Sequence, residues 1–189
     1  METLFGDFTL EDIYNAFAFA ETGSFENPWI RKTDRKAEGG STAFGPVQVT
    51  LGLLENYKDN ESAIFQDNQN IGDKLINQAN LFNYYGNEPH DIPVHPQHDS
   101  LIYKGIMGLQ DFLGGEGIHE AFDYGGRGTR INSGLRTEYK DFAQDMMLDM
   151  WNKNKNKDNA INSFIEAWRG VPEDEDPDYY KRFNTNLGR

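Results

Sequence analysis

The strongest periodic pattern in the chain begins at Thr9. Apolar residues then recur at intervals of three and four, at Leu10, Ile13, Tyr14, Phe17 and Ala20. This spacing places them on one face of a helix. Thr9 and Asp12 have the three-residue separation of a capping box, and Gly23 is a typical residue for ending a helix. The pattern predicts a helix that starts near residue 10 and ends at Gly23.

Four further segments show helical spacing. They start near residue 67, cover 101–113, start near residue 137, and run from about 159 to Gly170. Between them lie segments rich in Gly and Pro, which we interpret as loops over 22–46, 83–100 and 124–130. Short extended pieces are expected at 29–32 and 44–50. The fold class predicted is therefore mainly α, with a small hairpin or loop region after the first helix.

Length and charge narrow the classes of function. The chain has 189 residues, and we expect one domain over 1–189. It carries 31 acidic and 18 basic residues, a formal net charge of −13. Such a field repels phosphate backbones, so no nucleic-acid partner is expected. The longest nearly uncharged run, 13–20, is too short for a membrane span, and the first residues lack the features of a signal peptide.

Glu21 is the residue whose placement suggests chemistry. It follows Phe17 by four positions and Tyr14 by seven, so it shares the apolar face of the first helix. Partial burial and the negative end of the helix dipole would both raise the pKa of its carboxyl group. A carboxylic acid that keeps its proton near neutral pH can protonate a glycosidic oxygen. The alternative is a glutamate at a frayed helix end whose carboxylate turns to water.

The segment 41–50, STAFGPVQVT, strengthens the catalytic interpretation of Glu21. Together with Glu21-Thr22-Gly23 it resembles the lysozyme-like superfamily, particularly lytic transglycosylases and goose-type lysozymes. The resemblance implies a mainly helical α+β fold in which Glu21 is the catalytic acid. It also implies that Ser41, Gly45 and Gln48 line a glycan cleft, with Gln48 facing the substrate. The 24 residues from Glu21 to Gly45 (45 − 21) exceed the usual spacing, which implies an insertion.

A weaker resemblance lies near the C-terminus. The segment 167–170, AWRG, followed by Tyr180, resembles the family's Tyr-Asn-x-Gly segment and the tyrosine after it. Trp168 and Arg169 depart from the Tyr and Asn of that pattern. The alternative is a core tryptophan at a helix end. The rings expected to stack on sugar are Trp29, Phe44, Trp168 and Tyr180.

The choice between transglycosylase and hydrolase depends on a second carboxylate. A lytic transglycosylase uses one glutamate as acid and then base, while the 6-hydroxyl of the sugar attacks; an inverting hydrolase needs a second carboxylate to activate water. Asp34 and Glu38 are the candidates, although the neighbouring cations suggest surface ion pairs. We favour a transglycosylase with Glu21 alone, with hydrolytic muramidase as the alternative.

The remaining interpretations concern alternatives, ligands and setting. Chitinase-type endolysins have similar short motifs around Glu21 and Gln48, but have Tyr-x-Gly-Arg-Gly where this chain has Ala43-Phe44. A non-catalytic glycan-binding or structural virion protein is the competing class. His90, His95 and His98 form an irregular cluster, and neither a metal nor a cofactor is expected. The expected partners are peptidoglycan glycan strands and other virion proteins. A phage-encoded enzyme, virion-associated or released through a holin, is the expected setting.

Overall fold

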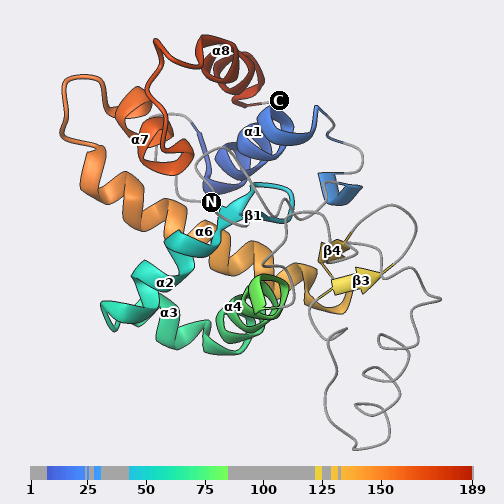
Figure 1. Ribbon diagram of the computed structural model, residues 1–189. Coiled ribbons are helices and arrows are strands. Elements are labelled where there is room, and N and C mark those ends of the chain that lie inside the picture. The colour runs from blue at the N-terminus through green and yellow to red at the C-terminus, as the bar shows by residue number, and fades with distance from the viewer. Residues whose placement is uncertain are drawn as a thin grey trace, which may run out of the picture.

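The computed structural model describes residues 8–23, 25, 28–30, 43–84, 122–124, 129–131 and 133–188. Over these residues the protein is mainly helical, as the sequence predicts (Figure 1). The α-helices are α1 (Leu10–Thr22), α2 (Leu51–Asp59), α3 (Ala63–Asp67), α4 (Gln69–Tyr84), α6 (Arg136–Asn154), α7 (Ala160–Arg169) and α8 (Pro177–Asn186). Two 3-10 turns are η1 (Pro28–Ile30) and η2 (Ser133–Leu135). The described residues contain no helix long and apolar enough to cross a membrane.

Helix α1 begins and ends where its sequence predicts. The Thr9 side chain accepts a hydrogen bond from the Asp12 amide, and the Asp12 carboxylate accepts one from the Thr9 amide, so the capping box is confirmed. Gly23 takes a left-handed conformation, with φ 72°, and its amide donates to the Phe19 carbonyl. The helix packs against α8 and α6 (Figure 1). Its C-terminal end is therefore surrounded by other helices.

Two antiparallel hairpins account for the described strands. Strands β1 (Ala43–Phe44) and β2 (Val49–Thr50) pair with Phe44 opposite Val49, so the extended piece expected over 44–50 is a tight hairpin. Strands β3 (Phe122–Tyr124) and β4 (Thr129–Ile131) pair within the segment that we expected to be only a loop. The expected extended piece at 29–32 is wrong at its start, because Pro28–Ile30 forms a 3-10 turn.

Helical periodicity located some elements and missed others. The helices expected near 67, 137 and 159 are α4, α6 and α7, and Gly170 ends α7 in a left-handed conformation. Helices α2, α3 and α8 were not predicted; α2 is capped by the Thr50 side chain, which accepts from the Leu53 amide. The loop expected over 83–100 is wrong at its start, because α4 continues to Tyr84; residues 85–100 and the expected helix over 101–113 lie outside the described residues.

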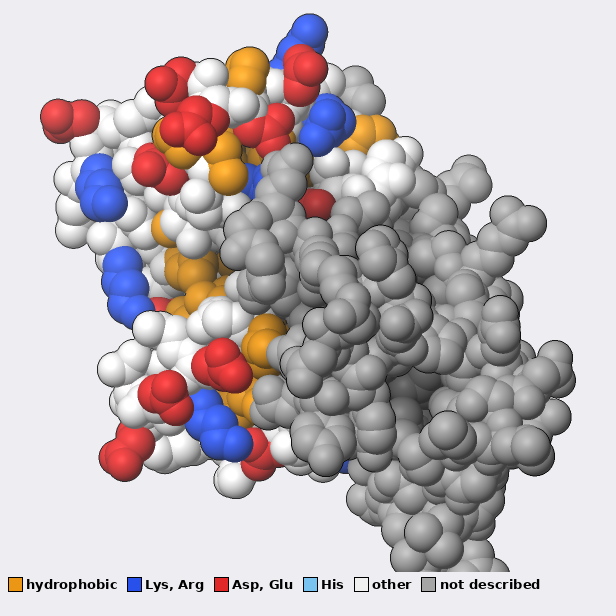
Figure 2. Space-filling view, in the orientation of Figure 1, with side chains coloured by type: hydrophobic (Ala, Val, Ile, Leu, Met, Phe, Trp, Pro, Cys, Tyr) orange, Lys and Arg blue, Asp and Glu red, His pale blue; other side chains and the backbone are white. Residues whose placement is uncertain are grey.

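The core lies where α1, α6, α7 and α8 meet. Phe17 of α1 contacts Phe164, Trp168 and Phe183, with ring centroids 5.4, 5.5 and 4.5 Å away. Met146, Met147 and Met150 of α6 are buried. On the face shown in Figure 2, acidic side chains gather at the top of the described surface, where Figure 1 shows α7 and α8. Large rings thus fix the end of α1 against α7 and α8.

Candidate active site

Glu21 lies in the last turn of α1 and is partly buried. Its charge acts on Tyr179 of α8. Burial raises the pKa of Tyr179 well above its usual value, and the negative charge of Glu21 and a hydrogen-bonding interaction with its side chain raise it further. The Tyr179 hydroxyl has no partner at ordinary hydrogen-bond geometry, so we treat its interaction with Glu21 as mainly electrostatic. A buried phenol therefore faces the proposed catalytic carboxylate.

Two arginines contact the same tyrosine ring. The guanidinium carbon of Arg169 lies 5.2 Å from the Tyr179 ring centroid, and that of Arg182 lies 5.7 Å from it. Arg182 also donates from Nε to the Ala20 carbonyl at 3.1 Å. A cation that binds a carbonyl in the last turn offsets the negative end of the helix dipole. The end of α1 is therefore more positive than the sequence suggested.

Arg169 links Glu21 to Asp176. Its Nη2 lies 3.3 Å from Asp176 Oδ2, and Asp176 also caps α8 by accepting from the Tyr179 amide. Burial lowers the pKa of Arg169, but the negative charges of Glu21 and Asp176 raise it above its usual value. By the same attraction, Arg169 favours the carboxylate form of Glu21. The sequence argument considered only burial and the helix dipole and omitted this cation.

The turn at 45–48 is held by Tyr139 of α6. The Tyr139 hydroxyl donates to the Phe44 carbonyl at 2.5 Å. Burial raises the pKa of Tyr139 well above its usual value, and the charge of Glu21 contributes to the same shift. A Cβ atom on Gly45 would lie 2.4 Å from Tyr139 Cζ, so only glycine allows this approach. Tyr139 thus contacts the turn directly, and the charge of Glu21 acts on the same hydroxyl.

Gln48 is the partly exposed polar side chain of this turn. It has a positive φ of 51°, and its Nε2 donates to the Gly45 carbonyl at 2.8 Å. The hydrogen bond fixes the amide group on the turn rather than leaving it to rotate in solvent. A fixed amide can recognise a hydroxyl or acetamido group with little loss of side-chain entropy.

Three rings expected to contact sugar have packing roles instead. Phe44, Trp168 and Tyr180 have relative exposures of 0%, 8% and 1%. Trp168 Nε1 donates to the Val47 carbonyl at 3.0 Å, and the Tyr180 hydroxyl donates to the Val171 carbonyl at 2.9 Å. A ring with no exposed face cannot stack on a sugar in this conformation. The alternative of a core tryptophan at a helix end describes Trp168 better.

Several residues of interest lie elsewhere. Asp34, Glu38 and Ser41 are outside the described residues, as are His90, His95 and His98. Among the residues that are described, no group of three His, Cys, Asp or Glu side chains could hold a metal ion. Sequence reasoning missed Tyr139, Tyr179 and Arg182, because their roles depend on which helix faces Glu21. The Tyr179-Tyr180 pair was the available signal, although it could not show which tyrosine meets the acid.

Comparisons with known proteins do not supply a family. No protein-family model, no curated protein and no solved structure matches the chain.

Proposed function

We propose that the protein cleaves the β-1,4 bond between N-acetylmuramic acid and N-acetylglucosamine in peptidoglycan, with Glu21 as the acid. The observation that carries the proposal is the convergence of four segments on one carboxylate. Glu21 comes from the end of α1, and its charge acts on Arg169 of α7, on Tyr179 of α8 and on Tyr139 of α6, whose hydroxyl binds the Phe44 carbonyl just before the 45–48 turn. A helix-terminal glutamate beside a Gly-x-x-Gln turn is what the lysozyme-like resemblance requires.

The proposed reaction needs only one carboxylic acid. Glu21 donates its proton to the glycosidic oxygen as the bond from that oxygen to C1 of the muramic acid breaks. The 6-hydroxyl of the same sugar then attacks C1, and the Glu21 carboxylate takes the hydroxyl proton. The products are a 1,6-anhydromuramic acid end and a free 4-hydroxyl, so Glu21 regains its proton.

The surroundings of Glu21 suggest how its proton is controlled. Arg169 favours the ionised form, which suits the second half of the reaction, when the carboxylate acts as base. For the first half, Arg169 has a second carboxylate partner in Asp176. Substrate binding that shifts Arg169 toward Asp176 would favour the protonated acid. The buried Tyr179 hydroxyl, which has no hydrogen-bond partner among the described residues of the free protein, would donate to the Glu21 carboxyl group in both stages.

Hydrolytic muramidase remains the second candidate, with water in place of the 6-hydroxyl. It would use Asp34 or Glu38 as the second carboxylate. A chitinase-type endolysin differs from both in its substrate, and a non-catalytic glycan-binding or structural virion protein would use Glu21 only as a structural residue. Delivery to the wall by a phage, in the virion or through a holin, belongs to the same proposal.

The proposal is tested by comparing the parent with Glu21→Gln on purified murein. Glu175→Gln, which changes an exposed carboxylate in the turn before α8, is the matched control. We expect the parent and the control to clear the murein and Glu21→Gln to leave it turbid. Equal clearing by Glu21→Gln would overturn the proposal. Mass spectra of the fragments separate 1,6-anhydro ends from reducing ends, and release of fragments from chitin oligomers would favour the chitinase-type alternative.

A further inference from the structure

A depression lies on the side of α6 that faces η1 and the start of α1. Its volume is about 470 Å³, and its lining includes Trp29 of η1, Glu11 of α1, and Arg136, Lys140 and Asp141 of α6. Glu21 is not part of this lining. The volume is within the range of sites that bind small ligands. We call this depression the Arg136 groove.

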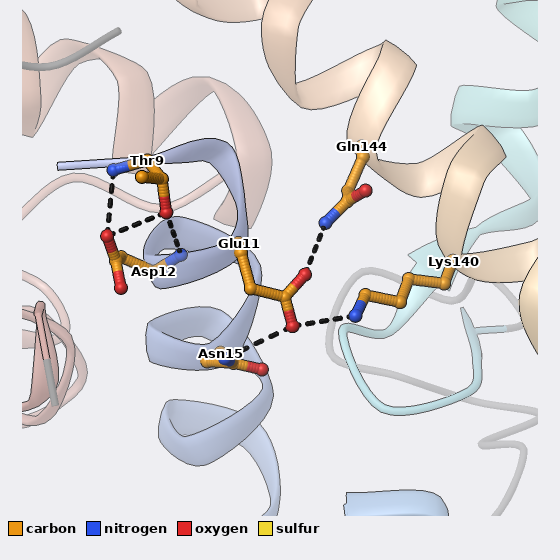
Figure 3. Close-up of polar contacts among 6 residues, drawn as sticks. All are labelled: Thr9, Glu11, Asp12, Asn15, Lys140 and Gln144. Atoms are coloured by element: carbon orange, nitrogen blue, oxygen red, sulfur yellow. Dashed lines mark hydrogen bonds and ion pairs between the residues drawn. The ribbon is translucent and has the colours of Figure 1, made fainter. Parts of the chain in front are cut away.

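Glu11 forms one wall of the Arg136 groove, and both of its carboxylate oxygens already have partners within the protein. Figure 3 shows the Glu11 side chain reaching from α1 toward Lys140 and Gln144 of α6. Lys140 Nζ lies 2.7 Å from one carboxylate oxygen, and Gln144 Nε2 donates to the other at 3.0 Å. Asn15 adds a longer contact of 3.4 Å. This network joins α1 to α6 and neutralises Lys140, so it provides a firm wall rather than a charge for a ligand.

Arg136 differs from Lys140, because no acidic side chain among the described residues forms an ion pair with it. Its guanidinium carbon lies 5.2 Å from the Trp29 ring centroid, and Trp29 is held edge-to-face against Tyr139 with centroids 5.6 Å apart. No carboxylate among the described residues pairs with Arg136, and its buried Nε has no hydrogen-bond partner there. In a chain of net charge −13, an arginine fixed on an aromatic ring without an acidic partner is unexpected. The planar guanidinium group of Arg136 can donate two parallel hydrogen bonds to a carboxylate.

Asp141 supplies the opposite charge in the same groove. Its side chain is exposed and forms no ion pair with the other described residues. It follows Arg136 by five positions on α6, an axial rise of about 7.5 Å. The two positions also lie about 140° apart around the helix axis, so a ligand that reaches both charges must be extended and about two residues or longer. A saccharide fits less well, because Arg136 occupies a face of the Trp29 ring.

We propose that the Arg136 groove binds a short peptide carrying both charges, with its carboxylate at Arg136 and its ammonium group at Asp141. This inference rests on the proposed function in one respect: in peptidoglycan, the ligand of that chemistry is the stem peptide. Binding there would hold the wall polymer at a point separate from the scissile bond and add to the affinity of the glycan site. The gain would come from linking two weak contacts in one substrate.

The test is a calorimetric titration with a synthetic stem tripeptide that has a free amino group and free carboxylates. Glu21→Gln protein is used, so that cleavage plays no part. We expect Arg136→Gln to weaken binding about tenfold or more, since it removes a charge-assisted pair. Lys157→Gln, which changes net charge equally at an exposed position outside the groove, should bind like the parent. Asp141→Asn should remove the preference for the free amine over its acetylated form.

Several results would overturn the inference. They are absence of tripeptide binding, equal binding by Arg136→Gln, or equal binding of the peptide whose carboxylates are amidated. If Arg136→Gln does not fold, amidation of the peptide tests the same contact on the unchanged groove. Failure of the proposed function is separate: a protein that binds the tripeptide but leaves murein intact loses the glycosidase proposal only. A protein that cleaves murein without binding the tripeptide loses this inference only.

Discussion

The indole nitrogen of Trp168 donates a buried hydrogen bond to the carbonyl oxygen of Val47, with a donor–acceptor distance of 3.0 Å. This bond ties the end of α7 to the 45–48 turn, 121 residues earlier in the chain. Trp168 is followed directly by Arg169, so the same bond positions the cation that interacts with Glu21. The geometry around Glu21 therefore depends on a contact that involves no catalytic group.

Trp168→Phe should test this tether. Phenylalanine preserves most of the ring packing against Phe17 but leaves the buried Val47 carbonyl without its donor. An unsatisfied buried acceptor costs about 1–3 kcal/mol, and we expect the free energy of unfolding in urea to fall by that amount. An unchanged midpoint would show that the bond contributes nothing to stability.

Gly45 and Gly23 form a matched pair of left-handed glycines, with φ 69° and 72°. Nothing lies within 4 Å of a Cβ on Gly23, whereas a Cβ on Gly45 would meet the Tyr139 ring. Gly23→Ala should therefore cost only the backbone strain, about 1–2 kcal/mol. Gly45→Ala should cost clearly more in the same denaturation measurement. Equal losses would contradict the close approach of Tyr139 to the turn.

Tyr179→Phe should separate activity from stability. The hydroxyl is buried without an ordinary hydrogen-bond partner, so its removal should leave the melting temperature unchanged or raise it. Under the proposed function, murein cleavage should fall roughly tenfold to a hundredfold, because the Glu21 carboxyl group loses its orienting neighbour. Tyr180→Phe is the control: it should lower stability by about 1 kcal/mol and keep the activity, since its hydroxyl binds Val171. The reverse pattern would assign the role to Tyr180.

Arg169→Gln should change the pH dependence of cleavage. Arg169 favours the carboxylate form of Glu21, so its removal lets the acid keep its proton to higher pH. A general acid loses activity as pH rises through its pKa. The alkaline limb of the pH–activity profile should therefore shift to higher pH. Arg169→Lys keeps the charge and should leave that limb in place. A profile of unchanged shape in Arg169→Gln would assign Arg169 a structural role.

The capping box of α1 should contribute to acid sensitivity. Hydrogen bonds from the Thr9 backbone and side chain lower the pKa of Asp12 in the folded protein. A lowered pKa stabilises the fold above the unfolded-state value of Asp12, and the stabilisation is lost as pH falls through the folded-state value. Asp12→Asn should therefore have a lower melting temperature than the parent near neutral pH, and the difference between the two melting temperatures should disappear in acid. Thr9→Ala should cost about 1 kcal/mol at neutral pH.

Local sequence was sufficient for much of the helical framework. The capping box at Thr9 and Asp12, the end of α1 at Gly23 and the end of α7 at Gly170 all follow from residues a few positions apart. Sequence patterns failed at Pro28–Ile30, where an extended piece was expected, and they missed the short helices α2, α3 and α8. Short elements present too few turns for a period to be read.

The identity of Glu21 as the residue to examine came from sequence alone, because its spacing from Phe17 and Tyr14 is a local property of one helix. Its surroundings came only from the tertiary structure. Tyr179 and Tyr180 are adjacent in sequence but about 100° apart around a helix, so the rotation of α8 against α1 decided which hydroxyl faces the acid. Periodicity reports which side of a helix is apolar; only packing between distant helices determines which charge lies beside another.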